Sequence, residues 1–95
     1  MPTEVRHAAE QSRYEILLDG RVVGIAEYFD RGGVLVFHHT EIDTSLRGDG
    51  LGAELVRAAL DDVRAQGRRI IPTCWYVVEF LELHPEYRDL VASPG

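Results

Sequence analysis

The residues of this sequence that could carry chemistry gather in two short segments. The first is the glycine-rich run Arg47-Gly48-Asp49-Gly50-Leu51-Gly52. Glycine lets backbone N–H groups approach a ligand closely, and a helix N-terminus adds free N–H donors and the positive end of its dipole. Together these features suit a pyrophosphate, to which Arg47 could add a charged contact. The other interpretation is a glycine-rich turn that only opens a helix.

The second segment surrounds the single cysteine, Cys74, which is expected at a strand end and immediately before a helix. A thiol at a helix N-terminus ionises more readily than a free thiol. Cys74 could therefore act as a nucleophile. Cysteine also packs as a small apolar group, so a buried structural cysteine is the other interpretation.

A third set of candidates could move protons, as a general base does. His39 and Glu41 are two residues apart in a predicted strand, so they are expected on one face, together with Phe37 and Leu35. They are candidates for the base or for binding the acceptor. A metal pair of His38 and His39 is not expected, since adjacent strand residues diverge, and no metal site is predicted.

The elements that must position these residues follow from hydrophobic periodicity. Asp19-Gly20 between two apolar runs is a strong signal for a type I′ hairpin. A second turn follows at residues 30–33. The first three strands, expected at residues 14–18, 22–29 and 34–42, therefore form an antiparallel meander.

After the third strand the apolar period changes from two to about 3.6. Leu51, Leu55, Ala59 and Val63 fall four apart, which predicts an amphipathic helix that Gly67 ends. A fourth strand at residues 69–73 and a second helix at residues 75–83 follow.

The predicted order is thus β-β-β-α-β-α, an α/β (α+β) fold with a mixed sheet. The third and fourth strands are joined through a helix and should be parallel. Their carboxyl ends then meet at one edge, so Gly52 and Cys74 are predicted to converge there.

The loop pattern Arg47-x-x-Gly50-x-Gly52 resembles the acetyl-CoA signature Gln/Arg-x-x-Gly-x-Gly/Ala of the Gcn5-related N-acetyltransferase superfamily. The wider pattern is similar to the small single-domain members of that superfamily, over about residues 14–90. It consists of His39–Ile42, the glycine loop, Ile70–Val77 and His84–Tyr87. The N-terminal helices that cover the acceptor site in full-size members have no counterpart in this sequence.

The resemblance implies a minimal acyl-CoA-binding domain. The pyrophosphate would bind residues 47–52, and the pantetheine arm would run near Ile42 and Asp43, between splayed strands. The resemblance also places Cys74 where small members carry a proposed catalytic cysteine, which implies that it acts at the thioester as a covalent acyl carrier. Tyr76 is expected as a wall of the cofactor pocket. Trp75, Phe80 and Tyr87 are predicted to pack between the last helix and the sheet.

The implied activity is transfer of an acetyl group from acetyl-CoA to an amine, either a protein lysine or a small amine. Two alternatives stay open at this point. One is a non-catalytic module that binds or senses acyl-CoA, and the other is a structural interaction domain in which the glycines serve only the turn.

Length, net charge and missing motifs limit the number of domains and the kinds of ligand. The chain of 95 residues is expected to form one domain, with flexible residues 1–12 and 92–95. Its net charge of −6 argues against nucleic acid as a partner. A Walker loop is excluded because no Gly-Lys-Ser/Thr follows the glycines, and a dinucleotide fold lacks its acidic residue.

Cysteine usage and hydropathy give the remaining expectations. One cysteine forms no internal disulfide, and no apolar run approaches the length of a membrane span. With no secretory signal, a cytoplasmic protein without membrane partners is expected. The sequence does not specify the oligomeric state.

Overall fold

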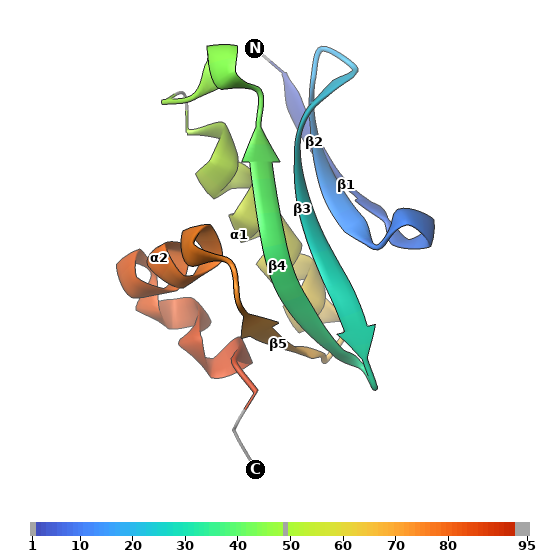
Figure 1. Ribbon diagram of the computed structural model, residues 1–95, viewed down its shortest axis with the longest axis vertical. Helices are drawn as coiled ribbons and strands as arrows, with labels where there is room; N and C mark the ends of the chain where they lie inside the picture. Colours follow the sequence, from blue (N-terminus) through green and yellow to red (C-terminus); the bar gives the residue numbers. More distant parts are fainter. Residues whose placement is uncertain (1, 49, 93–95) are drawn as a thin grey trace.

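In a computed structural model that describes residues 2–48 and 50–92, the chain forms a mixed five-stranded sheet with its main helices on one side (Figure 1). The strands lie in the order of the sequence. They are β1 (Thr3–Ala8), β2 (Arg13–Leu18), β3 (Arg21–Arg31), β4 (Val34–Ile42) and β5 (Arg69–Pro72). Neighbouring strands are antiparallel except for β4 and β5, which are parallel. The mixed α+β fold predicted from the sequence is confirmed.

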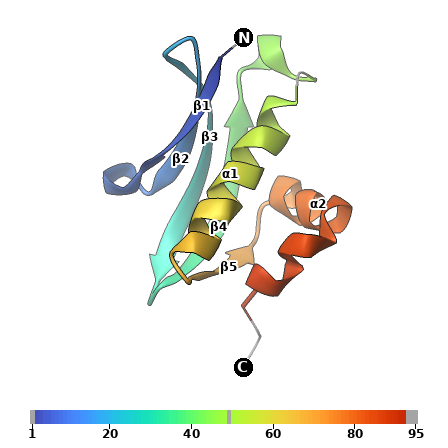
Figure 2. The ribbon, with the colours of Figure 1, turned by 180° about the vertical axis from the view of Figure 1, so that it is seen from behind.

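Two helices follow β4 in the chain. The longer, α1 (Leu51–Ala65), connects β4 to β5 and lies across one face of the sheet (Figure 2). The shorter, α2 (Trp75–Leu83), follows β5 and lies beside α1. The described part of the chain also contains three short 3-10 turns: η1 (Ala9–Gln11), η2 (Thr44–Leu46) and η3 (Pro85–Leu90). The opposite face of β1–β4, hereafter the open face, carries no helix from the described residues (Figure 1).

Local turn chemistry explains why the elements begin and end where they do. Asp19 and Gly20 have φ values of 51° and 81°, the left-handed pair that a type I′ hairpin requires. At the end of α1, the Gly67 N–H donates to the Arg64 carbonyl and the Arg68 N–H to the Val63 carbonyl. This is a Schellman end with glycine in the left-handed region, so both predicted signals are confirmed.

The core lies between the sheet and α1. The apolar stripe of α1 predicted from its period is buried, including Leu55, Leu60 and Val63 at zero exposure. Facing it from the sheet are Ile16 and Leu35, also fully buried. Phe80 and Tyr87, from α2 and η3, belong to the same core and lie against Arg57 of α1.

A β-bulge in β4 overturns one prediction. Tyr28 pairs with Phe37 but Glu27 pairs with His39, so His38 is an extra residue on β4. An extra residue reverses the alternation of side chains that follow it. Strand alternation predicted His39 and Glu41 on the same face of the sheet as Phe37. Because of the bulge, both side chains lie on the other face, which is the open face.

The N-terminal segment is a second correction. Residues 1–12 were expected to be flexible, but Thr3–Ala8 pair with β2 over their whole length. The His7 imidazole stacks on Tyr14 with ring centroids 4.2 Å apart, and its Nε2 lies 2.6 Å from the Tyr28 hydroxyl. These polar and aromatic contacts hold the strand. At the other end, the Ala92 N–H donates to the Ile70 carbonyl, and residues 93–95 of the expected flexible tail lie outside the described residues.

Candidate functional site

A cleft of about 530 Å³ opens where β4 ends and α1 begins. The glycine loop and the first turn of α1 form one wall, and the end of β4 and the first turn of α2 form the others. Its lining residues are Thr40, Ile42, Leu46, Arg47, Gly48, Gly50, Leu51, Gly52, Trp75 and Tyr76. The predicted convergence of the glycine loop and the segment after β5 is therefore present in the fold.

The cleft exists because β4 and β5 separate. Their pairing ends at Phe37 and Pro72, whereas β4 continues to Ile42. The Phe37 carbonyl accepts hydrogen bonds from the Thr73 N–H at 2.9 Å, the Cys74 N–H at 3.1 Å and the Thr73 hydroxyl at 3.2 Å. These bonds turn the chain away from β4 and into α2. Beyond them, the edge of β4 has no strand partner within the described part of the chain, and an extended ligand could lie along it.

The glycine loop presents backbone donors to this cleft. Gly48 and Gly50 have φ values of 93° and 77°, which side-chain-bearing residues rarely adopt. The first hydrogen bond of α1 runs from the Glu54 N–H to the Gly50 carbonyl, so the three preceding N–H groups are not used inside the helix. Free N–H groups at the positive end of a helix suit an anion. Asp49, also predicted to contact the cofactor, lies outside the described residues.

Gly52 has a different role from the other two glycines. It is buried, and a Cβ added to it would clash with the Tyr76 hydroxyl oxygen and lie 2.7 Å from Cζ of the same side chain. The absent side chain thus lets Tyr76 rest on the first turn of α1. Burial and, secondarily, the charge of Glu79 raise the pKa of Tyr76, so its hydroxyl keeps a proton at neutral pH.

The remaining residues predicted to contact the cofactor line either the cleft or a second hollow beside it. Ile42 lines the cleft, and exposed Arg47 lines both the cleft and a shallower hollow beside it. Asp43 lines only the hollow, and its carboxylate accepts hydrogen bonds from the N–H and the hydroxyl of Ser45. These bonds lower the pKa of Asp43. Its side chain therefore holds the η2 turn.

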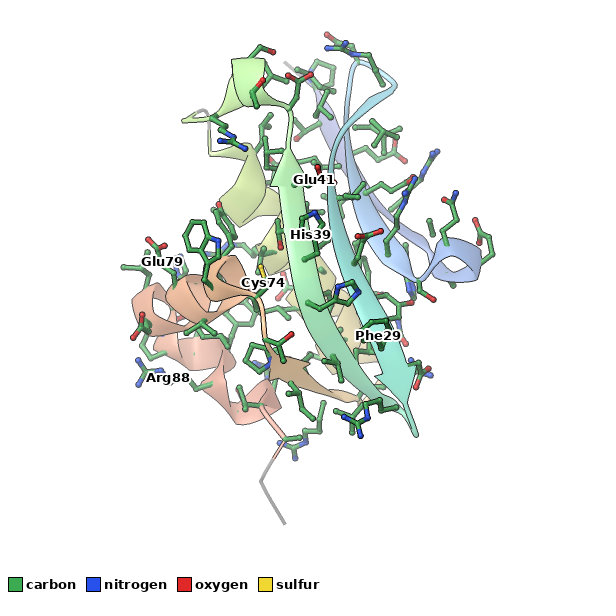
Figure 3. The ribbon with its side chains drawn as sticks, in the orientation of Figure 1. Phe29, His39, Glu41, Cys74, Glu79 and Arg88 are labelled. Carbon is green, nitrogen blue, oxygen red and sulfur yellow. The ribbon has the colours of Figure 1, made fainter. Side chains whose placement is uncertain are left out.

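The three predicted catalytic residues do not form one cluster. On the open face, His39 Nε2 lies 3.2 Å from Glu41 Oε2, and both side chains are exposed (Figure 3). Cys74 lies between β4 and α2, is only 8% exposed, and its thiol is 3.6 Å from the Thr40 hydroxyl (Figure 3). The bulge causes this separation, because it turns Thr40 rather than His39 or Glu41 toward the cleft.

The sequence analysis missed Thr40 and misplaced Trp75. Counting on from Phe37 in steps of two gives the wrong face for Thr40, since the bulge intervenes. Trp75 was predicted to pack against the sheet, but it lines the mouth of the cleft and is 72% exposed. It is the first residue of α2, on the side of that helix opposite to buried Val77.

No group of three or more His, Cys, Asp or Glu side chains that could hold a metal ion occurs in residues 2–48 and 50–92. In the same ranges, no helix has the length and apolar character that crossing a membrane requires.

Comparison with known proteins agrees with this geometry. The chain matches the family described as GCN5-related N-acetyl-transferase over residues 13–90, and it belongs to that family. Protein NATD1 of Bos taurus is 32% identical over 87 residues, which cover 88% of this chain and 76% of the relative. Protein NATD1 of Homo sapiens is 30% identical over the same length and the same shares.

Solved structures show the same fold. A GCN5-like protein from Staphylococcus aureus superposes with a TM-score of 0.70 at 21% identity, covering 97% of this chain and 90% of its own. The ribosomal-protein-S18-alanine N-acetyltransferase from Escherichia coli superposes with a TM-score of 0.58 at 15% identity, and the match covers 63% of this chain and 39% of that chain. At these identities the likeness concerns the fold alone.

Proposed function

We propose that this protein transfers the acetyl group of acetyl-CoA to an amine acceptor. The observation that carries the proposal is the continuous cleft from the separated edge of β4 to the free N–H groups of α1. One end suits a narrow extended arm and the other suits a phosphate. Family membership supports the same cofactor.

The described residues fit coenzyme A. The N–H groups at the start of α1, with Arg47 beside them, would hold the pyrophosphate, and Ile42 and Tyr76 would flank the arm. The bound cofactor supplies an acetyl group activated as a thioester. The chain itself must orient the amine, accept its proton and keep a proton available for the leaving sulfur.

His39 and Glu41 are suited to accept the proton. His39 directly follows the bulge, close to the point where β4 leaves β5, and the Glu41 carboxylate, 3.2 Å from its Nε2, can orient the imidazole. An amine that arrives from the open face meets this pair first. Tyr76, whose hydroxyl stays protonated, can donate a proton into the cleft from the other side.

Thermal unfolding with acetyl-CoA, CoA and NAD tests the cofactor assignment. Ligand at 100 times its dissociation constant stabilises a fold by about 2.7 kcal/mol. In a domain of this size that raises Tm by about 10 °C or more. We expect this shift with acetyl-CoA and CoA and no shift with NAD. No shift with either CoA species at millimolar concentration would refute the proposal.

Cys74 gives a second prediction. Because its thiol is nearly buried against Thr40, we expect Cys74→Ala to retain acetyl transfer within about threefold, whereas removing a base costs about 10²-fold or more. The comparison is between initial rates of Cys74→Ala and of the double variant His39→Ala/Glu41→Gln. A loss of 10²-fold or more in Cys74→Ala, with its acetyl-CoA melting shift intact, would instead establish the covalent role.

A further inference from the structure

The outer side of α2 is an unusual surface for a small acidic protein. Trp75, Val78 and Leu83 are exposed by 72%, 40% and 69%. Exposed carboxylates at Glu79 and Glu82 lie between them, because spacings of three, four, seven and eight residues fall on one side of a helix. We call these five residues the α2 stripe. The buried side of the same helix is made by Val77, Phe80 and Leu81.

The carboxylates of the stripe are not neutralised. Neither Glu79 nor Glu82 forms a salt bridge within the described part of the chain, and α2 contains no basic residue. Figure 3 shows Glu79 on the side of α2 that faces away from β4 and Cys74. An aromatic ring and aliphatic side chains beside free carboxylates match the chemistry of lysine and arginine, which carry a cation on an apolar stem.

The stripe is also continuous with the candidate site. Trp75 lies at one end of it and lines the mouth of the cleft, while Leu83 lies at the other end. A helix of nine residues is about 13 Å long, the span of about four extended residues. A peptide that lies along α2 would therefore reach the cleft with the residue at its end.

We propose that the α2 stripe is the docking surface for a basic segment of a protein acceptor, whose lysine passes Trp75 toward the thioester and the pair of His39 and Glu41. This inference rests on the proposed acetyl transfer and names the acceptor as a protein segment rather than a small amine. Electrostatics favours a basic segment over a second copy of the chain as the occupant of the stripe. Two-fold pairing of the stripe would bring Glu79 and Glu82 against the same residues of the other copy, whereas a basic segment meets opposite charge.

The chain offers two favourable conditions for a test. Trp75 is its only tryptophan, so intrinsic fluorescence reports on the stripe directly. The chain contains no lysine, so acetyl-lysine formed in an assay belongs to the peptide. The probe is an eight-residue peptide with one terminal lysine and four flanking arginines. Its control has glutamine in place of the arginines.

We expect the basic peptide, with and without CoA present, to change Trp75 emission saturably, and the glutamine peptide and spermidine to leave it unchanged. Glu79→Gln/Glu82→Gln should weaken binding about fivefold to tenfold at low salt and raise KM for the peptide with little change in kcat. Glu4→Gln/Glu10→Gln, with the same change of charge at exposed positions of β1 and η1, should behave like the unmodified chain.

The outcomes separate this inference from the proposed function. If the basic peptide binds but no acetyl transfer occurs, the docking surface stands and the enzymatic proposal falls. If transfer occurs equally to both peptides, or Glu79→Gln/Glu82→Gln binds like the control variant, the stripe is not the docking surface. Equal binding of spermidine would also overturn it, because a small amine would then suffice.

Discussion

Replacing Gly52 with valine is expected to abolish acetyl-CoA binding while leaving a folded protein. The new side chain would overlap the hydroxyl end of Tyr76, since even a single Cβ clashes with the hydroxyl oxygen and comes within 2.7 Å of Cζ. Tyr76 is only half-buried, so the ring can swing away at a cost of about 1–3 kcal/mol, typical of overpacking. The displaced ring then obstructs the cleft that it normally borders. We expect the melting shift with acetyl-CoA to disappear, which corresponds to binding at least about 100-fold weaker.

Two further variants test whether the loss of binding is caused by the displaced Tyr76 ring. Ala58→Val adds the same bulk on α1 at a half-exposed position away from the cleft, and it should keep the acetyl-CoA shift. Tyr76→Ala in the Gly52→Val background removes the obstruction and should restore binding to within about tenfold. If the double variant stays inactive in binding, Gly52 acts through close backbone approach to the ligand and not through Tyr76. A Gly52→Val protein that binds normally would show that the cleft is not the cofactor site.

The glycine loop shows what could be predicted from the sequence. Left-handed backbone at Gly48 and Gly50 and the helix start after them depend on local residue types, which the sequence displays directly. Gly52 has the same residue type for a different reason. Its neighbour Tyr76 is 24 positions further along the chain, so only the folded structure reveals the contact.

The bulge at His38 shows what could not be predicted. Strand alternation is a counting rule, and one extra residue invalidates the count for everything after it. No glycine or proline marks the bulge; two histidines stand side by side there. The bulge changes the candidate site, because it sends His39 and Glu41 to the open face and turns Thr40 toward Cys74.

The first strand was missed for a related reason. Residues 3–8 show little apolar alternation, so they have the composition of a flexible lead-in. What holds β1 to the domain is a polar and aromatic cluster of His7 with Tyr14 and Tyr28. Pairings of this kind join residues distant in the sequence, and hydrophobic periodicity does not reveal them.

Glu15 has the largest expected effect on stability among the charged residues. It is 2% exposed in β2, yet its carboxylate is fully paired: Oε1 lies 2.7 Å from Arg6 Nε and Oε2 lies 2.7 Å from an Arg13 guanidinium nitrogen. The hydrogen bond from Arg6, and next to it those from Arg13, lower the pKa of Glu15 despite its burial. Because β1 contributes Arg6, the carboxylate also ties the edge strand to the sheet.

We therefore expect Glu15→Gln to reduce the free energy of unfolding by about 2 kcal/mol at pH 7, the range of charge-assisted hydrogen bonds. A pKa lowered by folding stabilises the protein above the pKa of the unfolded side chain, about 4.3, and that stabilisation is lost as pH falls through the folded value. Urea unfolding of both proteins at pH 7, 5, 4 and 3 should thus give curves that differ most at pH 7 and converge below about pH 4. Glu10→Gln, exposed in η1, is the matched control and should leave stability unchanged at every pH. A difference that persists undiminished at pH 3 would mean that Glu15 acts through packing, and the arginine pairs would then contribute little to holding β1.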